Sequence, residues 1–262
     1  MKKYIRAILL VGWRIAFAYF CWMLRYARHP EKYDIEKRFA KIHKLSIKVL
    51  KALNVVYDVK GIDEFYKNKN PNENTLIIYN HLSDIDPVIM MALAKRPLTF
   101  VAKEETKKFP FVGKVIKSIS GIFLSRGDLR QEVKQILHVQ DMLKNYKNLD
   151  IVIFPEGTRN RKPLTDPLEF KHGSFRPAVK SNLDIAVFSI YGSQRVLNYK
   201  CKNKYNPIEI RLLKIFKKED YKDKTTSEIA LLAHDMVTKS VNELRVEDRV
   251  LMKKLNKKHF ND

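Results

Sequence analysis

Two short stretches of the chain carry side chains that could act together on one substrate. Residues Asn80 to Asp86 contain a histidine and an aspartate five positions apart, and Phe154 to Arg159 contain a glutamate, a glycine and an arginine. A histidine held by a carboxylate can take a proton from a hydroxyl group, and an arginine can bind a phosphate. Such a set suits acyl transfer onto a phosphorylated alcohol.

His81 and Asp86 could meet only across a turn. On a continuous helix a spacing of five places two side chains about 140° apart, so they would not share a face. Asp86 and Pro87 suit a helix start, because aspartate is a good N-cap and proline fits the first helical position. We therefore expect a loop in which Asp86 orients the imidazole of His81. Taken alone, Asp86 could simply cap a helix and His81 could be a loop histidine without a role.

Three cations follow predicted strands and could bind one anionic group. Arg159 lies in a turn after a buried strand, and Lys103 and Arg126 follow two other apolar runs. The other members of the turn that carries Arg159 are Glu156, Gly157 and Thr158. With 51 Lys+Arg in the chain, some cations reach strand ends by chance, so solvated charge explains Lys103 equally well.

Short apolar runs alternate with helical patterns from Asn54 onward. Runs typical of strands cover 55–59, 75–79, 98–102, 122–124, 151–154, 185–190 and 208–213, and helical patterns cover 87–94, 112–119, 129–146, 175–180 and 225–244. The alternation predicts an α/β domain with a mostly parallel mixed sheet flanked by helices. A ligand site in such a sheet lies at the strand ends, and both His81 and Glu156 follow predicted strands.

The first residues have the composition of a membrane-contacting helix. Residues 4–24 are apolar except for two arginines, and no small-residue cleavage site follows, which argues against a signal peptide. Five cations fall within a sector of about 100° on a helical wheel. They are Lys3, Arg6, Arg14, Arg25 and Arg28. One basic stripe favours a helix lying in the membrane interface, with a single spanning helix as the alternative.

A second amphipathic segment follows Pro30 and extends to Leu53. With the first helix it would form an N-terminal amphipathic helical hairpin, in which it is either a second membrane-docking arm or an ordinary surface helix packed on the catalytic domain. The chain is accordingly divided into membrane-docking helices over 1–53, an α/β domain over 54–244 and a basic tail over 245–262.

The charge balance favours an anionic partner. The net charge is +22, and residues 1–50 alone carry 12 Lys+Arg against 3 Asp+Glu. Such a surface suits a membrane with anionic lipids, a nucleic acid or an acidic carrier. No segment resembles a nucleic-acid-binding module, so we expect no nucleic-acid partner. Cys21 and Cys201 lack the spacing of a disulfide framework or zinc site, which favours a reducing compartment.

The motifs resemble those of the 1-acyl-glycerol-3-phosphate acyltransferase family, the lysophosphatidate acyltransferases. Asn80 to Asp86 matches the family's signature of a histidine and an aspartate separated by four residues, and 154–159 matches its second signature residue by residue. Three further segments, 101–113, 123–126 and 170–175, follow the family's order. The likeness covers roughly residues 54–195, and five elements in order are far more specific than one short motif.

The resemblance implies roles for these residues. His81 would be the general base on the sn-2 hydroxyl of a lysophosphatidate, oriented by Asp86, and that oxygen would attack an acyl thioester directly. The donor would be acyl-CoA or acyl-carrier protein, and no metal or bound cofactor is required. Glu156 would shape the site or bond the acceptor. The residues implied in substrate binding are Lys103, Arg126, Glu156, Gly157, Thr158 and Arg159.

The sequence departs from the family's pattern at three places, and the last of them, the fourth block, is linked to the fit of the acceptor or acyl chain. Asn160 stands where serine is usual, Ser120 lies where a glycine is expected, and 185–188 lacks the proline of the family's fourth block. The alternatives are therefore a relative that acylates another lysophospholipid or glycerol 3-phosphate, and a non-enzymatic basic peripheral membrane protein. The expected location is the cytoplasmic face of the membrane, reached through the N-terminal helix.

Overall fold

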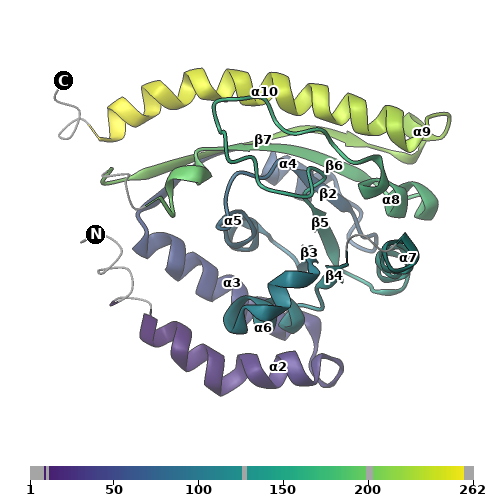
Figure 1. Ribbon diagram of the computed structural model, residues 1–262, viewed down its shortest axis with the longest axis horizontal. Coiled ribbons are helices and arrows are strands. Elements are labelled where there is room, and N and C mark those ends of the chain that lie inside the picture. The colour runs from purple at the N-terminus through teal and green to yellow at the C-terminus, as the bar shows by residue number, and fades with distance from the viewer. Residues whose placement is uncertain (1–8, 10–11, 126–128, 199–202, 257–262) are drawn as a thin grey trace.

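The computed structural model describes residues 9, 12–125, 129–198 and 203–256. Its centre is a seven-stranded sheet in the order β1-β7-β6-β2-β5-β3-β4 (Figure 1). The strands are β1 Val55–Lys60, β2 Leu76–Tyr79, β3 Leu98–Lys103, β4 Ile122–Leu124, β5 Asp150–Ile153, β6 Ile185–Tyr191 and β7 Asn206–Phe216. Strands β6 and β7 are antiparallel and the other neighbours are parallel. The predicted mostly parallel mixed sheet is confirmed.

The central strands are buried on both faces, which explains their nearly continuous apolar sequence. In β2, Leu76 and Ile78 belong to one core cluster, whereas Ile77 and Tyr79 belong to the cluster on the opposite face. Successive side chains of a strand point to opposite faces, so an apolar residue is needed at every position. The chain leaving β2 therefore starts from a rigid point deep in the protein.

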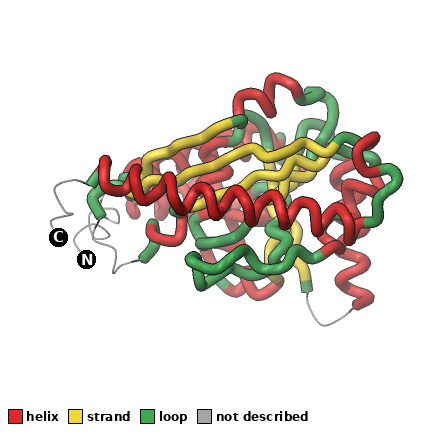
Figure 2. The backbone as a smooth tube through the Cα atoms, turned by 90° about the horizontal axis from the view of Figure 1, so that it is seen from above, coloured by secondary structure: helices red, strands yellow, loops and turns green. Residues whose placement is uncertain are grey.

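Helices cover both faces of the sheet (Figures 1 and 2). One face carries α3 Ile35–Ala52, α4 Ile62–Asn68, α5 Asp86–Leu93 and α6 Pro110–Ser118, and the other carries α7 Leu129–Asn145, α8 Arg176–Ser181 and α10 Thr226–Leu255. The remaining short elements are η3 Glu104–Lys108, η4 His172–Ser174, η5 Ser193–Arg195 and α9 Lys218–Tyr221. Helix α10 crosses the whole sheet in Figure 2 and extends well past the predicted end at residue 244, without a break at 245.

The N-terminal segment turns back on itself around Pro30 and forms the predicted helical hairpin (Figure 1). Residues 12–18 are α-helical and continue through the π-helical turn η1 Tyr19–Met23 into α2 Leu24–Arg28. A π-helical turn takes up an additional residue, so side chains after it are rotated relative to a regular helix. A helical wheel with one constant angle therefore does not apply across η1.

The exposed side of this N-terminal helix is aromatic. Trp13, Phe17 and Phe20 are 61%, 60% and 71% exposed, whereas Met23 is buried. The carbonyl of Met23 accepts a hydrogen bond of 3.2 Å from the Ser118 hydroxyl of α6. Two cations of the predicted basic stripe, Lys3 and Arg6, lie outside the described residues. None of the helices in the described part of the chain is long and apolar enough to cross a membrane.

Helix α3 uses its apolar face for packing. Phe39, Ile42 and Leu50 are buried in the core cluster that also contains Ile89 of α5. Arg38 is also buried, and its guanidinium donates to the Ser118 carbonyl at 2.7 Å. Helix α3 is therefore packed on the catalytic domain through this face.

Asn80 connects the end of β2 to its neighbour β6. Its side-chain Nδ2 donates to the Ile190 carbonyl at 3.0 Å, and its Oδ1 accepts from the Ile190 N–H at 2.8 Å. The side chain is fully buried. The two bonds replace ladder hydrogen bonds at the point where the chain leaves the sheet, and so they fix the start of the loop that carries His81.

Replacing Asn80 by alanine should lower the free energy of unfolding by about 1–3 kcal/mol, because two buried backbone groups of Ile190 would lose their partners. Urea unfolding followed by circular dichroism measures this. The exposed turn residue Asn72, changed to alanine, is the control and should stay close to wild type. Equal stability of both variants would show that the bridge does not hold the strand end.

Candidate active site

His81 and Asp86 meet across the loop between β2 and α5, as predicted. The imidazole Nδ1 lies 2.8 Å from Asp86 Oδ2. The ring stacks on Phe154 with 4.1 Å between ring centroids, which restricts its rotation. A carboxylate at Nδ1 favours the tautomer with hydrogen on that nitrogen, so Nε2 is the ring nitrogen left to accept a proton. The side chain of His81 is 16% exposed, enough for a substrate to reach one edge of the ring.

The carboxylate of Asp86 organises the loop and does not cap the helix. Its Oδ2 accepts hydrogen bonds of 2.8 Å from the Leu82 and Ser83 N–H groups in addition to His81. The expected helix start at Pro87 with an Asp86 cap is wrong, because α5 begins at Asp86 and its N-cap is Ile85. The side chain turns back toward the loop because three donors converge there.

The main chain of His81 is held on both sides by the turn after β5. Its N–H donates to Glu156 Oε1 at 2.6 Å, and its carbonyl accepts from the Asn160 N–H at 2.8 Å. The second oxygen of Glu156 accepts from the Leu168 N–H at 2.9 Å. Both carboxylate oxygens are therefore engaged by backbone groups. This geometry agrees with the first of the two roles considered for Glu156, shaping the site.

Burial has a strong effect on the protonation of Glu156. The residue is only 4% exposed, and removal of the carboxyl from water raises its pKa from 4.5 to about 7. The hydrogen bonds from the His81 and Leu168 N–H groups act in the opposite direction, since they favour the carboxylate, but they are outweighed by burial. Near neutral pH the Glu156 carboxyl is therefore close to its pKa while it bonds the loop that carries His81.

The turn after β5 brings cationic groups to the same edge. Gly157 has φ +65°, a backbone conformation that side chains other than glycine adopt with strain, and its N–H donates to the Phe154 carbonyl at 3.0 Å. The ammonium of Lys103 at the end of β3 lies 3.5 Å from the Thr158 hydroxyl. The guanidinium of Arg159 pairs with Asp84 of the histidine loop. Arg126, the third predicted cation, lies outside the described residues.

Sequence reasoning missed the residues that fasten the segment between Asn160 and Leu168. Asn160 is buried, and its side chain donates to the Asp166 carbonyl at 2.9 Å. From α10, the Arg245 guanidinium donates to the Thr165 carbonyl. The only signal in the sequence was that Asn160 departs from the family's usual serine, and its buried amide now gives that departure a structural reason.

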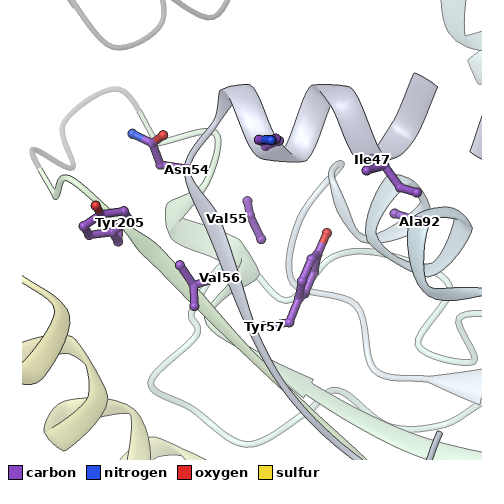
Figure 3. Close-up of a pocket in the computed structure, with 8 residues that line it drawn as sticks. Ile47, Asn54, Val55, Val56, Tyr57, Ala92 and Tyr205 are labelled. Carbon is purple, nitrogen blue, oxygen red and sulfur yellow. The ribbon is translucent and has the colours of Figure 1, made fainter. Parts of the chain in front are cut away.

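One cavity lies away from these motifs. It is a groove of about 300 Å³ between α3, the start of β1 and α5 (Figure 3). Ile47, Tyr57 and Ala92 give it an apolar lining, with Tyr205 at one end. It contains one lysine but no base, so we place the chemistry at the histidine loop instead.

A second polar cluster joins β1, β7 and α10. The carboxylates of Asp58, Glu209 and Glu247 lie within 4.8 Å of one another. The Arg211 Nη2 lies 2.7 Å from Asp58 and 2.8 Å from Glu247, where it takes the position a cation would need. We therefore regard this cluster as a structural link between α10 and the sheet.

Comparison with known protein families identifies the family to which the chain belongs. The family model described as "Acyltransferase" matches residues 57–192, which include every motif residue discussed above. The chain belongs to this acyltransferase family. The resemblance noticed in the motifs is thereby confirmed at the level of the family.

Individual relatives carry more detailed names. The chain is 30% identical over 175 residues to a "Probable 1-acyl-sn-glycerol-3-phosphate acyltransferase" of Mycoplasma pneumoniae, covering 64% of this chain and 61% of that protein. It is 29% identical over 137 residues to the 1-acyl-sn-glycerol-3-phosphate acyltransferase of Borreliella burgdorferi, with 52% of each chain covered. The match thus spans about three fifths or less of the length of these relatives.

A solved structure has the same fold. The crystal structure of the 1-acyl-sn-glycerophosphate acyltransferase PlsC from Thermotoga maritima superposes with a TM-score of 0.68. The two sequences are 24% identical, and the match covers 93% of this chain and 98% of that one. At this identity the likeness establishes the architecture, including the N-terminal helices, and leaves the substrate to be argued from the site.

The raised pKa of Glu156 predicts a pH effect on stability. The folded protein binds this proton up to about pH 7 and the unfolded chain only up to about 4.5. The stabilisation from protonated Glu156 is therefore complete below pH 4.5 and is lost as the pH rises through 7. Relative to Glu156→Gln, the wild type should lose at most about 1.4 kcal/mol of unfolding free energy per pH unit in this window.

Denaturant unfolding at half-unit pH steps measures that difference. The exposed Glu169→Gln variant serves as the control, and its curve should run parallel to the wild type. Parallel curves for Glu156→Gln as well would mean that Glu156 stays ionised throughout the range.

Proposed function

We propose that the protein transfers a fatty acyl group from an acyl thioester to the sn-2 hydroxyl of 1-acyl-glycerol 3-phosphate and so forms phosphatidate. The observation that carries the proposal is the His81–Asp86 pair, with Nε2 available, beside the turn that contains Arg159. The names of the relatives support the same acceptor. Either acyl-CoA or acyl-carrier protein would serve as donor.

The geometry supports a direct transfer. Nε2 of His81 takes the proton of the acceptor hydroxyl while that oxygen attacks the thioester carbonyl. The buried carboxylate of Asp86 stabilises the imidazolium that forms, without taking its proton. The carbon–sulfur bond then breaks, and the imidazolium returns the proton to the leaving thiolate. The chain's own residues accomplish each proton transfer, and the step requires no acyl-enzyme.

The acceptor phosphate is assigned to the cations at the strand ends. Arg159 can form two parallel hydrogen bonds to a phosphate, and Lys103 adds a point charge beside Thr158. Arg126 follows β4 in sequence and is proposed as a third ligand on the family resemblance. These cations would hold the phosphate while the glycerol hydroxyl reaches His81.

His81→Ala should abolish transfer without unfolding the protein, because loss of a general base lowers rates about 10²–10⁴-fold. The assay uses purified protein in anionic mixed micelles, with lysophosphatidate and glycerol 3-phosphate offered in parallel. His138→Ala, which removes an exposed histidine of α7, is the matched control. Normal turnover in His81→Ala would end the general-base proposal, and wild-type transfer to glycerol 3-phosphate alone would replace the acceptor.

We also propose that the protein docks on the cytoplasmic face of the membrane through its N-terminal helix. The exposed aromatic side chains of that helix are continued by Phe109 and Val112 at the start of α6. Helices α2 and α6 lie side by side (Figure 1). The Tyr19 ring packs on Phe111 with 6.3 Å between ring centroids. An aromatic surface on a strongly basic protein suits insertion among anionic headgroups.

Changing Trp13, Phe17 and Phe20 to alanine together should release most of the protein from vesicles rich in anionic lipid. The lost apolar contact is the physical reason. A matched variant removes three equally exposed apolar side chains from α10: Leu231, Val246 and Val250, which are 62%, 66% and 68% exposed. Sedimentation with vesicles compares the two, and equal binding by both would refute docking through the N-terminal helix.

A further inference from the structure

Asp84 forms an ion pair with Arg159, the cation that the proposed function assigns to the acceptor phosphate. Its Oδ2 is paired with Nη1 of Arg159 in a direct hydrogen-bonded ion pair. Asp84 belongs to the histidine loop and Arg159 to the turn after β5, 75 residues further along the chain. The pair therefore joins the two motifs directly across the site.

The position of Asp84 resembles that of a bound anion. A carboxylate and a phosphate both present oxygens to a guanidinium, and one arginine edge cannot serve both fully at once. Beside this pair, Lys103 and Thr158 offer a further ammonium and a hydroxyl group. Asp84 thus fills one side of a small cationic site that otherwise has the groups a phosphate needs.

We propose that Asp84 determines the affinity for the acceptor by holding Arg159 when no acceptor is bound and releasing it to the incoming phosphate. The inference rests on the proposed function for the identity of the acceptor. The ligand class at this point is a phosphate monoester, and Asp84 acts as its internal competitor.

The solvent exposure of Asp84 and Arg159 agrees with an ion pair that can open. The side chains of Asp84 and Arg159 are 65% and 36% exposed, so both can be solvated when they separate. Exposed ion pairs are weak, and their loss typically changes an equilibrium by about two- to fivefold. Asp86, two residues further on, is fully buried and bonded to three donors, so it cannot exchange in this way.

The consequence is a specific change in substrate affinity. Asp84→Asn should lower KM for lysophosphatidate by about two- to fivefold, because the phosphate no longer competes with a carboxylate. The value of kcat should stay near wild type, since the His81–Asp86 pair is unchanged. Asp63→Asn is the matched control. It removes another exposed aspartate, which lies on α4 and pairs with Lys95, and it changes the net charge equally. Its KM should equal that of the wild type.

A double-mutant cycle tests whether Asp84 changes KM through Arg159. In an Arg159→Gln background, Asp84→Asn should no longer lower KM, because the cation for which the two anions compete is absent. A KM that is unchanged or raised in Asp84→Asn alone would overturn the inference and leave Asp84 as a residue that positions Arg159. An equal decrease in Asp63→Asn would attribute the effect to net charge and would also overturn it.

Binding of inorganic phosphate separates this inference from the proposed function. Calorimetric titration of phosphate into the four proteins, wild type, Asp84→Asn, Asp63→Asn and Arg159→Gln, needs no acyl transfer. Tighter phosphate binding in Asp84→Asn alone, with loss in Arg159→Gln, supports the competition even if lysophosphatidate is not the acceptor. Phosphate binding that is indifferent to Asp84 overturns it, even where transfer to lysophosphatidate is observed.

Discussion

The convergence of three donors on one oxygen of Asp86 is the constraint on which the site depends. A buried carboxylate is costly unless hydrogen bonds compensate it, and Oδ2 receives the His81 ring and two backbone N–H groups. The same bonds force the loop after β2 to curl over the start of α5. The orientation of the imidazole and the path of the main chain are therefore set by one interaction, and neither can change without leaving the carboxylate uncompensated.

The turn after β5 completes this arrangement from the other side. Glu156 and Asn160 bond the N–H and carbonyl of His81, so the base is fixed through its backbone as well as its ring. Glu156 in turn fastens Leu168, and Arg245 of α10 holds the segment between them. A helix near the C-terminal end of the chain thus contributes to the position of a histidine at residue 81. Several elements therefore contribute contacts that fix the position of the base.

Much of this could be predicted from the sequence, for identifiable reasons. The central strands are buried on both faces and so leave unbroken apolar runs, and the predicted bounds of all seven strands lie within three residues of those observed. His81 and Asp86 were paired because only a turn could join them. The sequence did not show that the Asp86 carboxylate bonds the loop instead of capping the helix, because an aspartate suits both roles. The helical wheel that placed Arg25 and Arg28 on the same stripe as Arg14 assumed one constant angle, and the π-helical turn between them shifts the helical register, which no local pattern reveals.

The site divides its polar groups into two kinds, and the division follows from what each must do. The base and its orienter take part in every turnover and are held in a buried setting, where Asp86 has no exposed surface and three donors bond its Oδ2. The phosphate-binding groups must exchange partners with each substrate, and Arg159 and Asp84 are solvated enough to do so at little cost. Glu156 is also buried, and burial raises its pKa to about 7 while its carboxyl bonds the backbone of the loop from within. The residues that move a proton are thus buried and hydrogen-bonded, whereas the residues assigned to the ligand are exposed to solvent.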